Sequence, residues 1–197
     1  MTETATESLQ NRIHFFPRQI VAVEDFPAEG YILDVGGGGE GIISILKGER
    51  VVAVDTHKCE LEEAPAGPLK IVMDAAQLQF LDGAFGAATA FFSLMYVRET
   101  ADLERIFGEV YRVLRASAPF LVWDALVPRR EDETRSLYGI PLTIHVAERE
   151  VCTGYGHPWP RQKRTRAFYL DLARKAGFRV VEQKARGRVF FMRLQKP

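Results

Sequence analysis

The residues most suited to chemistry stand in one segment, Asp34-Val-Gly-Gly-Gly-Gly-Glu-Gly41. Glycine adopts positive φ without strain and lets the backbone come close to a ligand. If a helix begins after the glycines, its first N–H groups lack partners within the helix and face whatever lies there. The spacing Gly36-x-Gly38-x-x-Gly41 also fits the dinucleotide-binding fingerprint, with Asp55 as the acid at the end of the next strand. We therefore expect a cofactor site at this turn.

Asp34 separates two kinds of cofactor. A dinucleotide site presents backbone amides to a pyrophosphate, and a carboxylate beside the glycines would repel that anion. S-adenosylmethionine (SAM) carries a sulfonium and an ammonium group, so an acid at the same place is favourable. The sequence favours SAM, and an NAD-dependent oxidoreductase is the alternative.

This motif resembles the Asp-x-Gly-x-Gly turn of the class I SAM-dependent methyltransferases, here Asp34-Val-Gly-Gly-Gly38. The similarity is greatest to the methyltransferase type 11 group, which includes small-molecule enzymes like those of ubiquinone and menaquinone biosynthesis, and it covers roughly residues 30–124. It implies an enzyme that transfers a methyl group from SAM to a small molecule and releases S-adenosylhomocysteine (SAH). Glu40 departs from the family, which often has a third glycine there. Whether Glu40 faces the SAM ammonium group or solvent stays open.

The resemblance also implies a set of cofactor-binding residues: Asp34, Gly36, Gly37, Gly38, Asp55, Thr56, Asp74, Ala75, Ser93 and Leu94. In the family, the acid at the position of Asp55 binds the ribose hydroxyls. The acid at the position of Asp74 binds the adenine amino group, and the N–H of Ala75 would bind the ring. Ser93 and Leu94 would lie near the methionine part. A strand-end aspartate can also simply cap a turn.

Catalysis is less clearly marked. Methyl transfer is an in-line displacement, so alignment of the reactants can supply most of the rate enhancement. A general base is needed only where the acceptor must lose a proton on attack. The candidates are His145, Tyr155 and His157, with Asp124 at the end of the fifth predicted strand, and Tyr96 is a candidate for the acceptor pocket. For each of them, a purely structural role is the alternative.

Charge divides the chain into two parts. Residues 1–124 hold 10 Lys and Arg against 19 Asp and Glu, and residues 125–197 hold 16 against 7, so the net charge is zero. The basic surplus favours a neutral or anionic acceptor, although two solvated surfaces of opposite sign would give the same counts. The basic run 161–166 could bind nucleic acid, but it is short and precedes a predicted helix. We therefore expect a small-molecule acceptor rather than a nucleic acid.

The elements that must position these residues alternate between strands and helices. Short apolar runs at 31–35, 51–55, 69–73, 87–92 and 119–123 predict strands covered on both faces. A helical pattern from 103 to 114, with Thr100 as its N-cap, precedes the fifth strand. A second helix at 165–176, stopped by Gly177, precedes closing strands at 178–182 and 189–194. This order predicts a doubly wound α/β fold, and the resemblance implies a Rossmann-like sheet of seven strands, mostly parallel, with one antiparallel strand near the C-terminus.

A chain of 197 residues fits a single domain. Residues 1–11 are polar and predict a flexible tail rather than a signal peptide. Residues 125–163 show no sustained period and contain four prolines, which predicts a cap or lid over the acceptor, with packing on a neighbouring subunit as the alternative. Two cysteines, no clustered metal ligands and no long apolar run predict a cytoplasmic protein without a metal or a membrane span. Oligomeric state stays open, as does a SAM-binding partner subunit without catalysis.

Overall fold

Seven strands form the main sheet, in the order β10-β11-β7-β6-β3-β4-β5. The computed structural model describes residues 12–130, 134–161 and 163–197, so the predicted tail at 1–11 lies outside the described residues. All neighbours are parallel except β11, which is antiparallel to both β7 and β10. The predicted seven-stranded, mostly parallel sheet is confirmed. Its strands are β3 (Ile32–Val35), β4 (Val51–Asp55), β5 (Leu69–Val72), β6 (Ala87–Phe91), β7 (Pro119–Ala125), β10 (Arg179–Arg186) and β11 (Val189–Gln195).

The order of the strands reverses at β3. From β3 the chain continues to β4 and β5 on one side, and later returns to β6 and β7 on the other side. Every residue of β3 and β6 is buried, as expected for strands that are covered on both faces. A sheet of this kind binds its ligand where the order reverses, outside the carboxyl ends of the strands. The glycine-rich turn follows β3 at this point.

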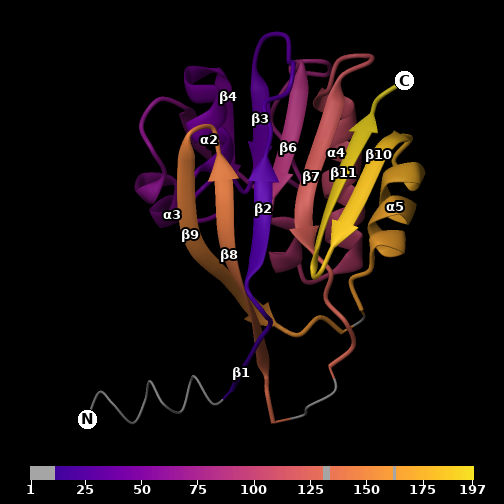
Figure 1. The fold of residues 1–197 in the computed structure, drawn as a ribbon. Helices are drawn as coiled ribbons and strands as arrows, with labels where there is room; N and C mark the ends of the chain where they lie inside the picture. The colour runs from indigo at the N-terminus through magenta and orange to yellow at the C-terminus, as the bar shows by residue number, and fades with distance from the viewer. Residues whose placement is uncertain (1–11, 131–133, 162) are drawn as a thin grey trace.

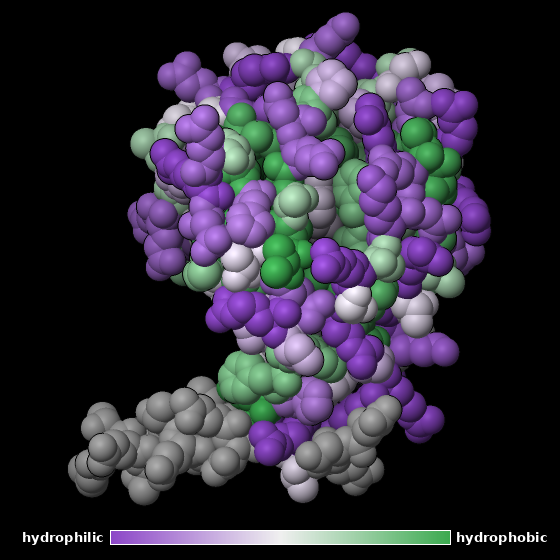
Figure 2. Space-filling view, in the orientation of Figure 1, coloured by the Kyte–Doolittle hydropathy of each residue, from purple (hydrophilic) through white to green (hydrophobic). Residues whose placement is uncertain are grey.

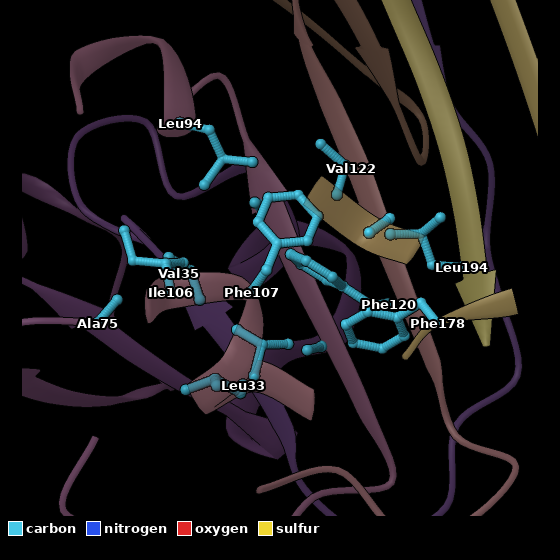
Figure 3. Packing of buried hydrophobic residues seen from close by; sticks show 14 of the residues in the cluster. Leu33, Val35, Ala75, Leu94, Ile106, Phe107, Phe120, Val122, Phe178 and Leu194 are labelled. Carbon is cyan, nitrogen blue, oxygen red and sulfur yellow. The ribbon is translucent and has the colours of Figure 1, made fainter. Parts of the chain in front are cut away.

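Two helices, α4 (Thr100–Val113) and α5 (Arg166–Lys175), belong to the hydrophobic core on one face of the sheet. Figure 3 shows Ile106 and Phe107 of α4 close to side chains of the sheet such as Leu33 and Phe120. The predicted N-cap of α4 was off by one residue: Glu99 is the N-cap and Thr100 is already helical. Thr165 does cap α5, because its hydroxyl accepts the N–H of Phe168 at 3.2 Å.

The remaining helical elements are short. They are α2 (Ile42–Lys47), α3 (Lys58–Glu63) and two 3₁₀ segments, η1 (Gly48–Arg50) and η2 (Leu94–Tyr96). Helix α2 follows the glycine-rich turn, and η2 follows the carboxyl end of β6. Among the described residues, no helix is both long enough and apolar enough to cross a membrane.

A second sheet contains β1 (Ile13–Phe15), β2 (Gln19–Val23), β8 (Leu137–Val146) and β9 (Arg149–Pro158). Strand β8 pairs with β9 antiparallel, and with β1 and β2 in parallel. Residues 125–163, which show no sustained period in the sequence, therefore contain regular strands. This segment contributes the last residue of β7 and a long hairpin, which pairs with an N-terminal segment that the sequence pattern did not identify as strands.

The hairpin is explained by an alternation of period two in β8. Every second residue is buried, with exposed fractions of 0 or 1%: Tyr138, Ile140, Leu142, Ile144 and Val146. Pro141 interrupts this run and disguises it. Within β8, the residues Leu137–Gly139 pair with β1 and the residues Leu142–Val146 pair with β2. Pro141 therefore lies opposite the gap between β1 and β2. A proline is tolerated there because no ladder hydrogen bond to either strand is lost.

The second sheet packs on the face of the main sheet opposite α4 and α5. The apolar side chains of β8 share a buried cluster with Ile42 and Ile43 of α2 and with Trp123 of β7. Figure 1 shows β2, β8 and β9 in front of the main sheet, and Figure 2 shows that the outer surface of this side is largely hydrophilic. The hairpin is thus part of the core between two layers.

Leu142→Ala tests this packing. Leu142 has no exposed surface, so we expect the free energy of unfolding to fall by about 2–5 kcal/mol. Leu81, which is 84% exposed, offers the matched control Leu81→Ala, with an expected change within about 0.5 kcal/mol. Urea denaturation measures both. Equal, small effects of the two substitutions would contradict a core position for the hairpin.

Candidate active site

A cavity of about 580 Å³ opens at the carboxyl ends of the central strands. Its size lies in the range of pockets that hold small ligands. The lining includes every residue of the predicted cofactor site: Asp34, Gly36, Gly37, Gly38, Asp55, Thr56, Asp74, Ala75, Ser93 and Leu94. These residues come from the segments that follow β3, β4, β5 and β6, so the topology brings together what the sequence separates. The assignment of SAM contacts to individual residues stays a prediction.

The glycine-rich turn has no room for a side chain at Gly36 or at Gly38. The N–H groups of Gly36 and Gly37 both donate to the carbonyl of Val54, at 2.8 and 3.2 Å, which ties the turn to β4. Gly36 has φ of 69°, and a Cβ there would lie 2.3 Å from the Cβ of Ser93. A Cβ on Gly38 would lie 2.5 Å from the Cβ of Glu60. The glycines thus allow three neighbouring segments to meet around the cavity.

Asp34 is buried at the end of β3 and is only 2% exposed. Its Oδ1 accepts a hydrogen bond from the hydroxyl of Thr89, at 2.7 Å. Burial raises the pKa of Asp34 to about 7; the bond from Thr89 lowers the pKa, and the charge of Asp55 raises it. The carboxyl group therefore gains or loses its proton near neutral pH. A cation bound in the cavity would favour the ionised form.

Asp55 is the last residue of β4, and Asp74 stands two residues after the end of the neighbouring β5. The Oδ1 of Asp55 accepts the N–H of His57 at 2.9 Å, and the Oδ1 of Asp74 accepts the N–H of Ala76 at 2.8 Å. Each aspartate thus caps the turn after its strand while it also lines the cavity. The two roles are compatible, because a carboxylate has a second oxygen that can face a ligand.

Aromatic side chains form the part of the cavity beyond β6. Phe92 is buried and has φ of 48°, which is rare for a bulky residue. Its ring stacks on that of Tyr155 from β9, with a centroid distance of 5.4 Å and an interplanar angle of 30°. Ser93 follows, and its hydroxyl donates to the carbonyl of Val35 at 2.6 Å. Tyr96, in η2, lines the same region.

Tyr155 is the one of the three catalytic candidates that lines the cavity. Its hydroxyl donates to the carboxylate of Glu40 at 2.8 Å. Burial and the charge of Glu40 raise the pKa of Tyr155 well above its usual value, so the hydroxyl stays protonated and acts as a donor. The question about Glu40 is answered in part: its carboxylate turns toward β9 and also accepts a hydrogen bond from Thr153.

The two histidines lie elsewhere. His157 meets the ring of Tyr96 edge-on, at 5.4 Å between centroids, and is therefore one residue removed from the lining. Burial lowers the pKa of His157, which favours its neutral form. His145, another catalytic candidate, is not among the residues that line the cavity. It lies 3.8 Å from Glu150 and is exposed on β8, because the alternation of β8 turns it away from the core.

Asp124, the candidate at the end of β7, does not line the cavity either. It is fully buried behind η2, where its Oδ2 accepts the N–H of Met95 at 3.1 Å, and burial raises its pKa to about 7. Arg164 donates to the carbonyls of Val97 and Arg98, at 3.1 and 2.9 Å. The two buried side chains hold the segment 95–98 that forms one wall of the cavity. Because Arg164 is only 2% exposed, the run 161–166 is not a continuous basic surface.

The lining of the cavity is acidic, although the last third of the chain has a surplus of basic residues. Five acids line the cavity: Asp34, Glu40, Asp55, Glu60 and Asp74. Neither Lys nor Arg is among the described residues that line it. The basic surplus of the last third therefore does not reach the cavity, and the expectation of a neutral or anionic acceptor has no support. Glu60 and Phe92 were not identified from the sequence as residues of the cavity, because neither belongs to a recognisable motif. Their positions depend on how α3 and β9 pack.

Comparisons with known proteins agree with this geometry. Residues 33–122 match the family described as methyltransferase domain. A comparison with curated protein sequences finds no match.

Similar solved structures include a SAM-dependent methyltransferase from Methanosarcina mazei, with a TM-score of 0.63 and 17% identity over 87% of this chain and 94% of that one. Another, from Mesorhizobium loti, has a TM-score of 0.60 and 16% identity over 87% and 94%. A glycopeptide N-methyltransferase in complex with SAM has a TM-score of 0.58 and 16% identity over 87% and 89%. The family match covers residues 33–122, and the chain shares the Rossmann-like α/β fold of these methyltransferase structures.

Proposed function

We propose that this chain binds SAM in the cavity and transfers its methyl group to a small molecule. One observation carries the proposal. The residues that would hold the cofactor come from four separate strand ends, and all of them line one cavity of suitable size. The sulfonium group of SAM supplies an activated methyl group, and the contribution of the protein is to align it with the acceptor and to exclude water.

The strand order divides the cavity into two halves. The acids after β4 and β5, Asp55 and Asp74, lie on one side of β3, where the ribose and adenine would bind. The aromatic residues after β6 lie on the other side. Asp34 and the glycine-rich turn lie between them, where the methionine part would bind. This division leaves the aromatic half for the acceptor.

The cap role of residues 125–163 belongs to the same proposal. Their hairpin supplies Tyr155 to the cavity wall, and the buried face of β8 fixes that wall to the main sheet. The segment then shapes the acceptor pocket as a rigid wall. A role in packing against a second subunit is the alternative, and the oligomeric state is open.

Two other functions compete. An NAD-dependent oxidoreductase would need a pyrophosphate beside Asp34, whose Oδ1 already faces Thr89 and whose burial disfavours a second negative charge nearby. A partner subunit that binds SAM without transferring a methyl group would have the same cofactor site. Binding of SAM but not of NADH would exclude the oxidoreductase. Turnover of SAM to SAH would exclude the partner subunit without catalysis.

SAM, SAH and NADH added to the purified protein separate these functions. A ligand that binds only the folded state raises the melting temperature, so SAM and SAH should raise it and NADH should not. Formation of SAH in the presence of a fractionated metabolite pool then shows turnover. Stabilisation by NADH alone would overturn the cofactor assignment, and SAM binding without turnover of any fraction would favour the partner subunit.

Asp55→Ala removes the carboxylate that is predicted to bind the ribose hydroxyls. Loss of charge-assisted hydrogen bonds should weaken SAH binding by about 1–3 kcal/mol. Asp82→Ala is the matched control, because Asp82 is an exposed acid that pairs with Arg112 and does not line the cavity. Isothermal titration calorimetry measures both. An unchanged dissociation constant for Asp55→Ala would remove Asp55 from the site.

SAH affinity should depend on pH through Asp34. With its pKa raised to about 7, Asp34 is protonated below neutral pH in the free protein. The SAH ammonium favours the carboxylate, so binding releases a proton, and affinity should rise by roughly 10-fold between pH 5.5 and 7.5. Titrations in buffers of different ionisation enthalpy count the released proton.

Asp34→Asn should flatten this dependence. Asp124→Asn is the control: the pKa of Asp124 is also raised to about 7, but the residue does not line the cavity. This variant should keep the slope. If the slope survives in Asp34→Asn, the titrating group is not Asp34.

A further inference from the structure

The aromatic half of the cavity contains one carboxylate that the cofactor assignment does not use. Glu40 lies in the glycine-rich segment, between Gly39 and Gly41. Both of its carboxylate oxygens accept hydrogen bonds from β9: Oε2 from the hydroxyl of Tyr155 at 2.8 Å, and Oε1 from the hydroxyl of Thr153. These donors stand two residues apart and so lie on the same face of β9. The carboxylate is therefore held in a fixed position.

The surroundings of Glu40 fit a cation better than an anion. Phe92, Tyr96 and Tyr155 line this half of the cavity, and aromatic faces attract cations. Phe92 and Tyr155 stack on each other, and the positive φ of Phe92 is retained only because the surrounding packing dictates it. The described residues that line the cavity include neither Lys nor Arg, the side chains that would attract an anion. Rigid aromatic rings beside a fixed carboxylate are well suited to an ammonium group.

The total charge of the lining points the same way. SAM carries two positive groups and one carboxylate, so its net charge of +1 would neutralise only part of a lining with five acids. Asp55 and Asp74 would face uncharged hydroxyl and amino groups of the adenosine. A second ligand with positive charge would relieve the remaining repulsion among the carboxylates.

We propose that Glu40 determines the specificity for the methyl acceptor and selects a molecule that carries a protonated amine. This inference rests on the proposed function and names its substrate class. In the reaction, the acceptor nitrogen loses one proton to water, and its lone pair forms the new bond to the methyl carbon. The electron pair of the breaking carbon–sulfur bond stays on sulfur, which gives SAH and an N-methylated product.

Three aromatic probes of similar shape test the proposal: benzylamine, benzyl alcohol and benzoate, which are cationic, neutral and anionic at pH 7. Each is titrated into protein saturated with SAH, so that methyl transfer cannot occur. Benzylamine should bind at least tenfold more tightly than benzoate, with benzyl alcohol between them. Preference for benzoate, or equal binding of the three, would overturn the proposal.

Glu40→Gln keeps the shape of the side chain and removes its charge. We expect benzylamine affinity to fall about tenfold, which is the size of effect for a hydrogen bond to a charged group, while SAH affinity stays within twofold. Glu63→Gln is the matched control, because Glu63 is exposed on α3 and does not line the cavity. If Glu40→Gln weakens SAH and leaves benzylamine unchanged, Glu40 binds the methionine ammonium group and the proposal is wrong.

Two further measurements keep the test decisive. If circular dichroism shows that Glu40→Gln does not fold, Tyr155→Phe replaces it. This variant keeps the ring stacked on Phe92, frees the carboxylate of Glu40, and should lower benzylamine affinity by severalfold. Unchanged affinity would count against the proposal. Failure of wild-type protein to bind SAH would remove the proposed function and this inference together, whereas SAH binding without amine preference would remove this inference alone.

Discussion

The structure depends on one steric constraint, the absence of a side chain at Gly36 and at Gly38 in the turn between β3 and α2. At Gly36 and Gly38 the nearest neighbours are Ser93 after β6 and Glu60 of α3, so close that a Cβ would overlap them. The turn can therefore lie between the ends of β4 and β6, and it donates two hydrogen bonds to one carbonyl, that of Val54 in β4. Because the sheet order reverses at β3, this contact brings the two halves of the cavity together. A larger residue at either position would separate them.

A second requirement follows from the way the two faces of the main sheet are covered. One face carries α4 and α5, but α2 and α3 contain only six residues each and cannot cover the other. Strand β8 meets this need with five apolar side chains at alternate positions, and the cluster that they form includes Phe92 next to the cavity. The same hairpin then brings Tyr155 and Thr153 to Glu40. One hairpin thus both buries the sheet and builds the aromatic wall of the cavity.

The sequence predicted the main sheet because its strands are read from local patterns. The run 51–54 is apolar without interruption, which is typical of strands that are covered on both faces. The acids of the cavity were predictable for a related reason: Asp34 and Asp55 lie at the ends of the runs 31–35 and 51–55, and Asp74 directly follows the run 69–73. The second sheet was missed although the alternation from Tyr138 to Val146 is strict, since Pro141 suggested a break. The sheet tolerates Pro141 because this residue lies opposite the gap between β1 and β2, and these two strands are far from Pro141 in the sequence.

The aromatic half of the cavity could not be predicted, because its residues come together only through contacts between distant segments. Glu40 and Tyr155 are 115 positions apart, and nothing near either residue indicates that they meet. The charge counts were misleading for the same reason: Arg164 belongs to the most basic run of the chain, yet its side chain is buried, where it binds the carbonyls of Val97 and Arg98. That buried cation helps to fix the wall from behind while the acids face the cavity. The sign of charge that a ligand meets is therefore set by which side chains the fold turns inward, and in this cavity those side chains are carboxylates and aromatic rings.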